Sequence, residues 1–149
     1  MRIVICSGFM NPIHTGHIDY IEAAKALGDY LIVIVNNDEQ VKLKGSTPFM
    51  SESDRLRIVE SMGCVDKAMI SIDSDSSVVS SLKLIHRRYS LDVFVDSITF
   101  ANGGDRTAGN SPEETYCKEA GILTAYGVGG GKTQSSSELI GNANKLNNE

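Results

Sequence analysis

The chain has 149 residues, 41% of them hydrophobic, and a formal net charge of −5. This length suits one domain with one core, and the acidic balance argues against a nucleic-acid or membrane-surface binder, because such proteins normally carry a basic face. No run approaches the roughly 18 consecutive apolar residues of a membrane-spanning helix, and the cysteines at positions 6, 64 and 117 are too far apart for a disulfide framework or a CxxC metal pair, which favours a reducing cytoplasm.

The N-terminal part of the chain predicts a βαβ unit. The β-branched run at residues 3–6 predicts a buried strand that is followed by a loop. Apolar residues then recur near helical spacing over residues 16–27, with Gly28 as a plausible terminator. The continuous apolar run at residues 30–35 predicts a second strand that is covered on both faces.

The alternation of helices and strands continues through the middle of the chain. We expect a loop over residues 36–50, and then a helix that Ser51 caps and that ends at Gly63. Its buried face would hold Leu56, Val59 and Met62. Residues 68–72 predict a third strand. Ser74 or Asp75 can cap the next helix, whose buried face would hold Val78, Leu82 and Ile85.

The last third of the chain predicts two more strands. One lies around residues 92–95, and residues 98–101 either extend it or form a separate strand. Ser111 and Pro112 predict the start of a helix, and residues 122–128 predict the final strand. After the glycines at 129–131 we expect a helix through Leu139 and Ile140, and then a polar tail over residues 142–149.

Together these elements predict a single α/β domain over residues 1–149, with a Rossmann-like, mostly parallel five-stranded sheet and helices on both faces. In such sheets ligands bind at the carboxyl ends of the strands. The loops that leave those ends are expected at residues 7–16, 36–50, 101–110 and 129–137.

The first of these loops contains a phosphate-binding candidate. His14 and His17 lie three residues apart at a helix start, so both rings face one side. Backbone N–H groups and the helix dipole favour an anion there, and Gly8 and Gly16 let phosphate oxygens approach the main chain. Two alternatives remain open: the histidines only cap and decorate the helix, or they bind zinc, for which His86 lies on a distant helix.

The HxGH element at residues 14–17 and the helix after it resemble the first motif of the cytidylyltransferase-like nucleotidyltransferase superfamily. The likeness to glycerol-3-phosphate cytidylyltransferase and heptose-1-phosphate adenylyltransferase extends through residues 24–33 and Asn37-Asp38. The resemblance implies that CTP or ATP gives CMP or AMP to a phosphorylated small molecule such as a sugar or polyol phosphate, with pyrophosphate as the leaving group and Mg²⁺ as cofactor. A phosphoamine or a phosphonate is a further possible acceptor, and we expect a homodimer.

The resemblance also implies the roles of individual residues. It assigns catalysis to His14, His17 and Lys44, and contacts to phosphate or acceptor to Lys42, Lys44 and Arg55. It assigns the nucleotide to a larger set from both ends of the chain: Gly8, Phe9, Met10, Asn11, Thr15, Gly16, Gly103, Asp105, Gln134, Ser135, Ser136 and Ser137. By sequence alone the lysines and Arg55 could equally be solvated surface charges, and the metal ligands are unknown.

Departures from the family pattern leave two alternatives for the base of the nucleotide substrate, cytosine and adenine. Gly130 and Lys132 stand where cytidylyltransferases carry an arginine and a glutamate, and Asn11 stands where they carry an aspartate. Overall likeness favours CTP, whereas the Gly103-Gly104-Asp105 element favours ATP. The Asn11-Pro12 pair also resembles nicotinamide-mononucleotide adenylyltransferases, so that type, the pantetheine-phosphate type and a non-catalytic nucleotide-binding module are alternatives.

Overall fold

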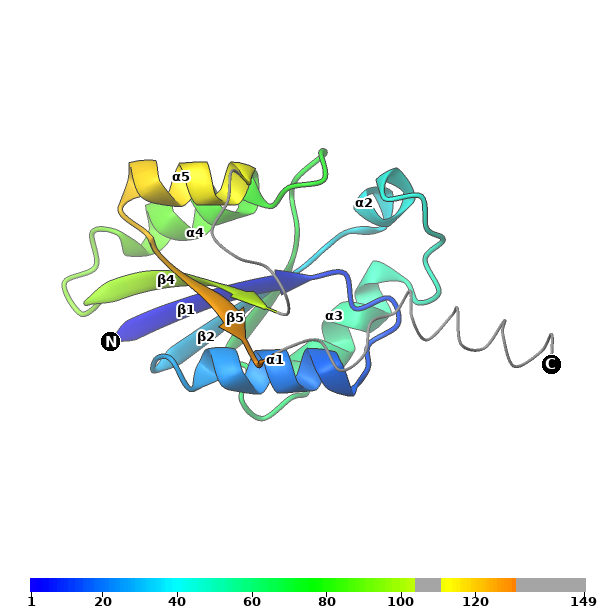
Figure 1. The fold of residues 1–149 in the computed structure, drawn as a ribbon, viewed down its shortest axis with the longest axis horizontal. Coiled ribbons are helices and arrows are strands. Elements are labelled where there is room, and N and C mark those ends of the chain that lie inside the picture. The colour runs from blue at the N-terminus through cyan, green and yellow to red at the C-terminus, as the bar shows by residue number, and fades with distance from the viewer. Residues whose placement is uncertain (104–110, 131–149) are drawn as a thin grey trace.

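One parallel sheet organises the chain, as the computed structural model shows for residues 1–103 and 111–130 (Figure 1). The strand order is β3-β2-β1-β4-β5, and every neighbouring pair is parallel, which confirms the predicted sheet. The strands are β1 (Arg2–Gly8), β2 (Tyr30–Val35), β3 (Lys67–Ile70), β4 (Ser97–Gly103) and β5 (Leu123–Val128). The helices are α1 (Thr15–Lys25), α2 (Asp38–Leu43), α3 (Glu52–Glu60), α4 (Val79–Tyr89) and α5 (Pro112–Ala120).

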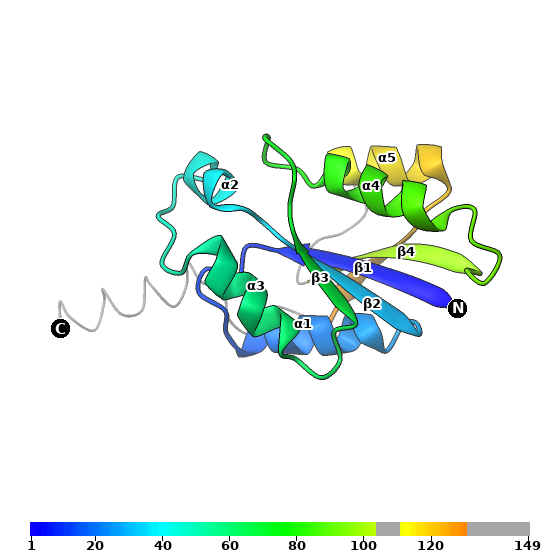
Figure 2. The same cartoon turned by 180° about the vertical axis from the view of Figure 1, so that it is seen from behind.

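The strands are buried on both faces because helices cover each side of the sheet. Ile3 and Ile5 of β1 pack with residues of α4 and α5, whereas Val4 and Cys6 of the same strand pack with residues of α1 and α3. Figures 1 and 2 show these two helical layers from opposite sides. Successive side chains point to opposite faces, and both faces are buried, so the central strands have continuous apolar sequences.

The prediction of a strand at residues 92–95 is wrong. These residues lie in the turn before β4, and Val93 and Phe94 are 87% and 77% exposed. The strand is Ser97–Gly103, which includes residues 98–101, because only there does the chain pair with β1 and bury Ile98 and Phe100.

The predicted loop at residues 36–50 contains a short helix, α2. Asn37 caps it by accepting a hydrogen bond from Gln40 N, and the Gln40 side chain completes the capping box. Gln40 Nε2 also donates to the carbonyls of Asp75 and Ser77. These distant contacts hold a helix of six residues that would be marginal alone.

The predicted caps have mixed outcomes. Ser51 and Ser111 cap α3 and α5 as expected. Helix α4 begins at Val79, and neither Ser74 nor Asp75 caps it, because the Asp73 carboxylate accepts hydrogen bonds from Ser80 N and Ser81 N instead. The final helix through Leu139 and Ile140 and the tail at 142–149 lie outside the described residues.

Candidate functional site

The site lies where the strand order changes direction. The chain moves from β1 to β2 on one side and from β4 to β5 on the other, although β1 and β4 are neighbours. In open parallel sheets this switch point leaves a crevice at the carboxyl ends of the strands, where ligands bind. Here those ends are Gly8 of β1 and Gly103 of β4, so the loop that leads to His14 leaves from the crevice.

Both histidines of the HxGH element hold the start of α1. His14 is the N-cap residue, with extended φ and ψ of −145° and 178°, and its Nδ1 accepts a hydrogen bond from Gly16 N at 3.0 Å. His17 Nδ1 accepts one from His14 N at 3.1 Å, which closes a capping box. The ring centroids lie 4.0 Å apart. His14 therefore caps the helix, as the first alternative states, and His17 belongs to the same capping box.

Capping by Nδ1 determines which atom each ring offers to a ligand. A neutral imidazole has one N–H, and a ring whose Nδ1 accepts a hydrogen bond carries its hydrogen on Nε2. His14 and His17 thus have two parallel tasks, with Nδ1 toward the backbone and Nε2–H as a donor. The first turn of α1 contains no acidic residue, so the helix start has the electrostatic character that favours an anion.

The loop between β1 and α1 is held by buried side chains. Met10 is fully buried with φ of 50°, and a Cβ added at Gly8 would lie 2.9 Å from Met10 Cε. Asn11, only 7% exposed, donates from Nδ2 to Thr47 O and accepts from Phe49 N at 2.7 Å. The side chains of Met10 and Asn11 therefore shape the loop, and the nucleotide contacts that the resemblance implied for these two residues stay a prediction.

Arg55 is placed differently from its predicted role as a phosphate contact. Its side chain has no exposed surface. The guanidinium donates to three carbonyls and to one carboxylate, at distances from 2.6 to 3.1 Å: Phe9 O, Asn36 O, Met50 O and Asp38 Oδ1. These bonds direct the Arg55 side chain inward, where it connects the loops around the crevice. Its charge is therefore not presented to a ligand.

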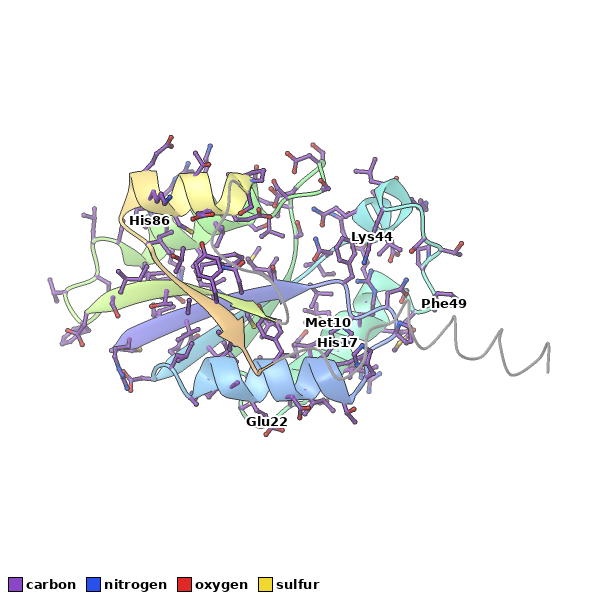
Figure 3. The ribbon with its side chains drawn as sticks, viewed as in Figure 1. Met10, His17, Glu22, Lys44, Phe49 and His86 are labelled. Atoms are coloured by element: carbon purple, nitrogen blue, oxygen red, sulfur yellow. The ribbon has the colours of Figure 1, made fainter. Side chains whose placement is uncertain are left out.

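The two predicted lysines have different positions. Lys44 ends α2, and its Nζ lies 4.4 Å from the centroid of the Phe9 ring. Figure 3 shows Lys44 at the same end of the sheet as Met10 and His17. Lys42 pairs with Glu39 at 3.0 Å on the exposed side of α2. The structure brings Lys44, but not Lys42, next to the loop that precedes His14.

Two aromatic residues in contact with the candidate site's loop and strands were not predicted from the sequence. Phe49 follows α2 and is 60% exposed, on a segment that Asn11 holds. Tyr20 of α1 donates from its hydroxyl to Ala101 O, and its ring would clash with a Cβ at Gly103. A Cβ at Gly129, where φ is 87°, would lie 3.0 Å from Tyr20 Cα. No local pattern could reveal contacts between residues so far apart in the chain.

Part of the predicted nucleotide site belongs to segments that the structure does not describe. Asp105 and the segment from Gln134 to Ser137 lie outside the described residues. The last described residues before these segments are Gly103 and Gly130. Gly103 and Gly129 both lie against Tyr20, a residue of the helix that begins with the HxGH element. Thr15 and Gly16, also predicted nucleotide contacts, form the start of that helix.

The buried thiol nearest the crevice is unsuited to nucleophilic chemistry. Burial raises the pKa of Cys6 far above its ordinary value, and burial raises the pKa of Cys117 to about 11. Thiols in such surroundings stay protonated and unreactive near neutral pH.

Fold and site together define an α/β protein with a parallel sheet and a helix start suited to phosphate at the switch point of that sheet. Residues 5–109 match the family model described as cytidylyltransferase-like, and the chain belongs to this family. It is 43% identical over 75 residues to an FAD synthase from Ferroglobus placidus, a match that covers 50% of this chain and 49% of that protein. It is 41% identical over 85 residues to the bifunctional protein HldE from Helicobacter pylori, covering 55% of this chain and 18% of HldE.

Solved structures show the same fold at lower identity. The lipopolysaccharide core biosynthesis protein from Thermoplasma volcanium has a TM-score of 0.63 and 23% identity, with 85% of this chain and 93% of that chain covered. The NadR protein in complex with NAD and AMP-PNP has a TM-score of 0.55 and 15% identity, with 97% of this chain and 41% of that chain covered.

Residues 1–103 and 111–130 contain no helix with the length and apolar character needed to cross a bilayer. The same residues contain no cluster of three or more histidine, cysteine, aspartate or glutamate side chains suited to hold a metal ion.

Proposed function

We propose that this protein is a nucleotidyltransferase that moves a nucleoside monophosphate from a nucleoside triphosphate to the phosphate of a small acceptor. The observation that carries this proposal is the double use of His14 and His17 at the switch point. Their Nδ1 atoms hold the helix start, and imidazoles held in this way carry their hydrogen on Nε2, the kind of donor that a phosphate oxygen accepts from. Membership of the cytidylyltransferase-like family supports the same reaction class.

In the proposed reaction an acceptor phosphate oxygen attacks the α-phosphorus of the nucleotide. A new P–O bond to the acceptor forms while the bond to the β-phosphate bridging oxygen breaks, and that electron pair leaves with pyrophosphate. The protein orients the two substrates in line and stabilises the charge that develops on the phosphate oxygens. His14 and His17 donate to the α- and β-phosphates, and Lys44 contributes positive charge from the end of α2.

We propose Mg²⁺ as the cofactor. Mg²⁺ usually keeps several waters and is bound by substrate phosphates with one or two carboxylates, so a site that forms chiefly around the triphosphate fits a crevice of neutral and cationic donors. It would neutralise phosphate charge, and the residues of this chain would hold and align the triphosphate.

ATP is the proposed nucleotide. Overall family likeness favours CTP, but the relative from Ferroglobus placidus is an FAD synthase, and FAD consists of flavin mononucleotide joined to AMP. Isothermal titration calorimetry of the whole chain with ATP and with CTP, both with Mg²⁺, separates the two bases. We expect tighter binding of ATP, whereas tighter binding of CTP would reverse this assignment without affecting the reaction class.

The acceptor is a phosphate monoester, and two kinds have support. Likeness to sugar- and polyol-phosphate enzymes favours a hydroxyl-rich acceptor. The exposed Phe49 ring favours a planar acceptor such as flavin mononucleotide, because Asn11 holds its segment beside the crevice and an exposed aromatic ring stacks well on a flat partner.

Pyrophosphate release across a panel of acceptors tests the proposal. The panel contains flavin mononucleotide, sugar phosphates, polyol phosphates, nicotinamide mononucleotide and phosphopantetheine, each with ATP and CTP. Phe49→Ala should raise KM for a planar acceptor and leave KM for glycerol 3-phosphate unchanged. Nucleotide binding without turnover on any acceptor would favour a non-catalytic module.

A further inference from the structure

Strands β1 and β4 separate from each other before either strand ends. The last residues that pair between them are Ile5 and Phe100, yet β1 continues to Gly8 and β4 continues to Gly103. On its other side each strand stays paired up to that last residue, β1 with β2 and β4 with β5. The crevice at the switch point therefore begins inside the sheet, at the residues that directly follow the last pair.

The side chain of Tyr20 occupies this point. Tyr20 lies on α1 three residues after His17, so the two side chains leave the helix on the same face. The Tyr20 hydroxyl donates a hydrogen bond to Ala101 O. Burial raises the pKa of Cys6, and a hydrogen bond with the Tyr20 side chain lowers it to a smaller extent. Cys6 and Ala101 directly follow the last pair of β1 and β4, so one hydroxyl bridges the two strands where they separate.

The rest of the Tyr20 residue lies against the ends of β4 and β5. A Cβ added at Gly103 would lie 2.5 Å from Cδ1 of the Tyr20 ring, and a Cβ added at Gly129 would lie 3.0 Å from Tyr20 Cα. Glycine at both positions allows this close approach. Figure 1 shows the carboxyl end of β5 beside α1. Tyr20 thus connects the helix of the HxGH element to the strand ends on both sides of the crevice.

We propose that Tyr20 is a positioning residue that sets the width of the crevice between the HxGH helix and the end of β4. The inference rests on the proposed function. Tyr20 holds the helix start with His14 and His17 at a fixed distance from the strand end at Gly103, and a displacement of reacting groups by about 1 Å can lower a rate roughly 100-fold. Because its hydroxyl is engaged with Ala101 O, Tyr20 acts through the helix and the strand and not on the reacting atoms.

Two substitutions at Tyr20 separate the hydroxyl from the ring. Tyr20→Phe keeps the ring and removes the bridge between the strands, and kcat for pyrophosphate release should fall about 10-fold. Tyr20→Leu removes both parts, and kcat should fall roughly 100-fold. Nucleotide affinity, measured by calorimetry with ATP and with CTP, should change much less than kcat, because the phosphate donors remain. Rates are measured well below the thermal midpoint of each variant, so a lower kcat does not reflect unfolded protein.

A matched control and a double variant test whether the effect belongs to this contact. Tyr116→Phe removes a hydroxyl from α5 on the opposite face of the sheet and should leave kcat unchanged. Gly103→Ala should displace the Tyr20 ring and lower kcat, and it should cost little more when Tyr20 is already leucine, since residues that act through one contact are not additive. Additive losses, or a kcat of Tyr20→Leu close to wild type, overturn the proposal.

Phosphorus NMR of the bound nucleotide makes the test independent of turnover. The α- and β-phosphate signals should have different chemical shifts on Tyr20→Leu and on wild type, whereas Tyr116→Phe should reproduce the wild-type shifts. A wild-type protein that binds nucleotide but releases no pyrophosphate with any acceptor would refute the proposed function, while changed shifts would still assign Tyr20 to the positioning of the bound phosphates. Identical shifts on wild type and Tyr20→Leu, or no nucleotide binding by wild type, overturn the inference.

Discussion

His14 and His17 hold the start of α1, and the proposed reaction gives the same two side chains a second task as donors to phosphate. Their Nδ1 atoms accept backbone hydrogen bonds at the start of α1, and a substitution to alanine would remove both functions at once. Asparagine is a strong N-cap residue, and glutamine fits the third position of a capping box. His14→Asn and His17→Gln therefore keep the helix start with the amide oxygen in the place of Nδ1, while their remaining donor is an amide N–H that no longer occupies the position of the imidazole Nε2–H.

Each of these two variants should lower kcat by roughly 100- to 1000-fold, as expected for the loss of one transition-state donor. Nucleotide affinity, measured by calorimetry, should change much less. Circular dichroism and the thermal midpoint should stay close to wild type. A variant that kept nearly full turnover would show that the ring does not contact the reacting phosphates.

Arg55 makes a contrasting prediction, because its role is in the fold. Arg55→Met would leave three carbonyls and the Asp38 carboxylate without their donor, and loss of such buried partners costs about 3 kcal/mol. The free energy of unfolding in urea measures this loss. The matched control is Arg57→Met, an exposed arginine of the same helix, which should change stability little.

At the scale of elements, α2 positions a cation beside the loop that leads to the HxGH element. Lys44 at its end lies over Phe9, whereas Lys42 pairs with Glu39. Lys44→Met should lower kcat/KM about 10-fold, the effect of one charged hydrogen bond, and Lys42→Met should have a smaller effect. Steady-state kinetics with both variants decides this, and equal losses would place both lysines in the site.

Elements with local signals could be predicted, and elements held by distant contacts could not. The βαβ unit and the caps at Ser51 and Ser111 follow from patterns within a few residues of each other. Helix α2 was missed because Gln40 binds carbonyls 35 and 37 residues away. The β-branched and aromatic residues at 93–95 favour a strand by propensity, but only residues from Ser97 onward pair with β1.

The candidate site was predicted in the same uneven way. The HxGH motif is contiguous, so its place at a helix start was evident from spacing. The inward direction of Arg55, Met10 and Asn11 depends on the packing of β1, β2 and α3 against each other, which no short pattern encodes. The identity of the nucleotide base stays a prediction, as do the contacts of Asp105 and of Ser135 to Ser137.

At the scale of the whole molecule, the ion pair between Lys25 and Asp66 makes the stability of the fold depend on pH in acid. Partial burial alone would raise the pKa of Asp66, but hydrogen bonds from Lys25 Nζ and Leu31 N outweigh it, and the pKa is lowered from its ordinary value. A carboxylate with a lowered pKa stabilises the folded state at neutral pH, and this contribution is lost as pH falls below roughly 4.

Thermal midpoints between pH 7 and pH 3 test this response. Asp66→Asn should lower the midpoint at pH 7 and flatten its decline toward pH 3. Asp19→Asn, which changes an exposed carboxylate of α1, should leave the pH profile unchanged. A profile of Asp66→Asn parallel to wild type would show that another group governs acid unfolding.

The fold as a whole places a helix start with two imidazole donors at the switch point of a parallel sheet, and the proposed reaction rests on that placement. The most direct test uses ATP labelled at the α-phosphorus, an acceptor that supports pyrophosphate release, and wild-type and His14→Asn protein. We predict that the label appears in the acceptor product in equal amount to the pyrophosphate released, at a rate roughly 100- to 1000-fold lower in the variant. Label that stays in ATP or appears as free AMP with every acceptor, or equal rates in the two proteins, would contradict nucleotidyl transfer at this site.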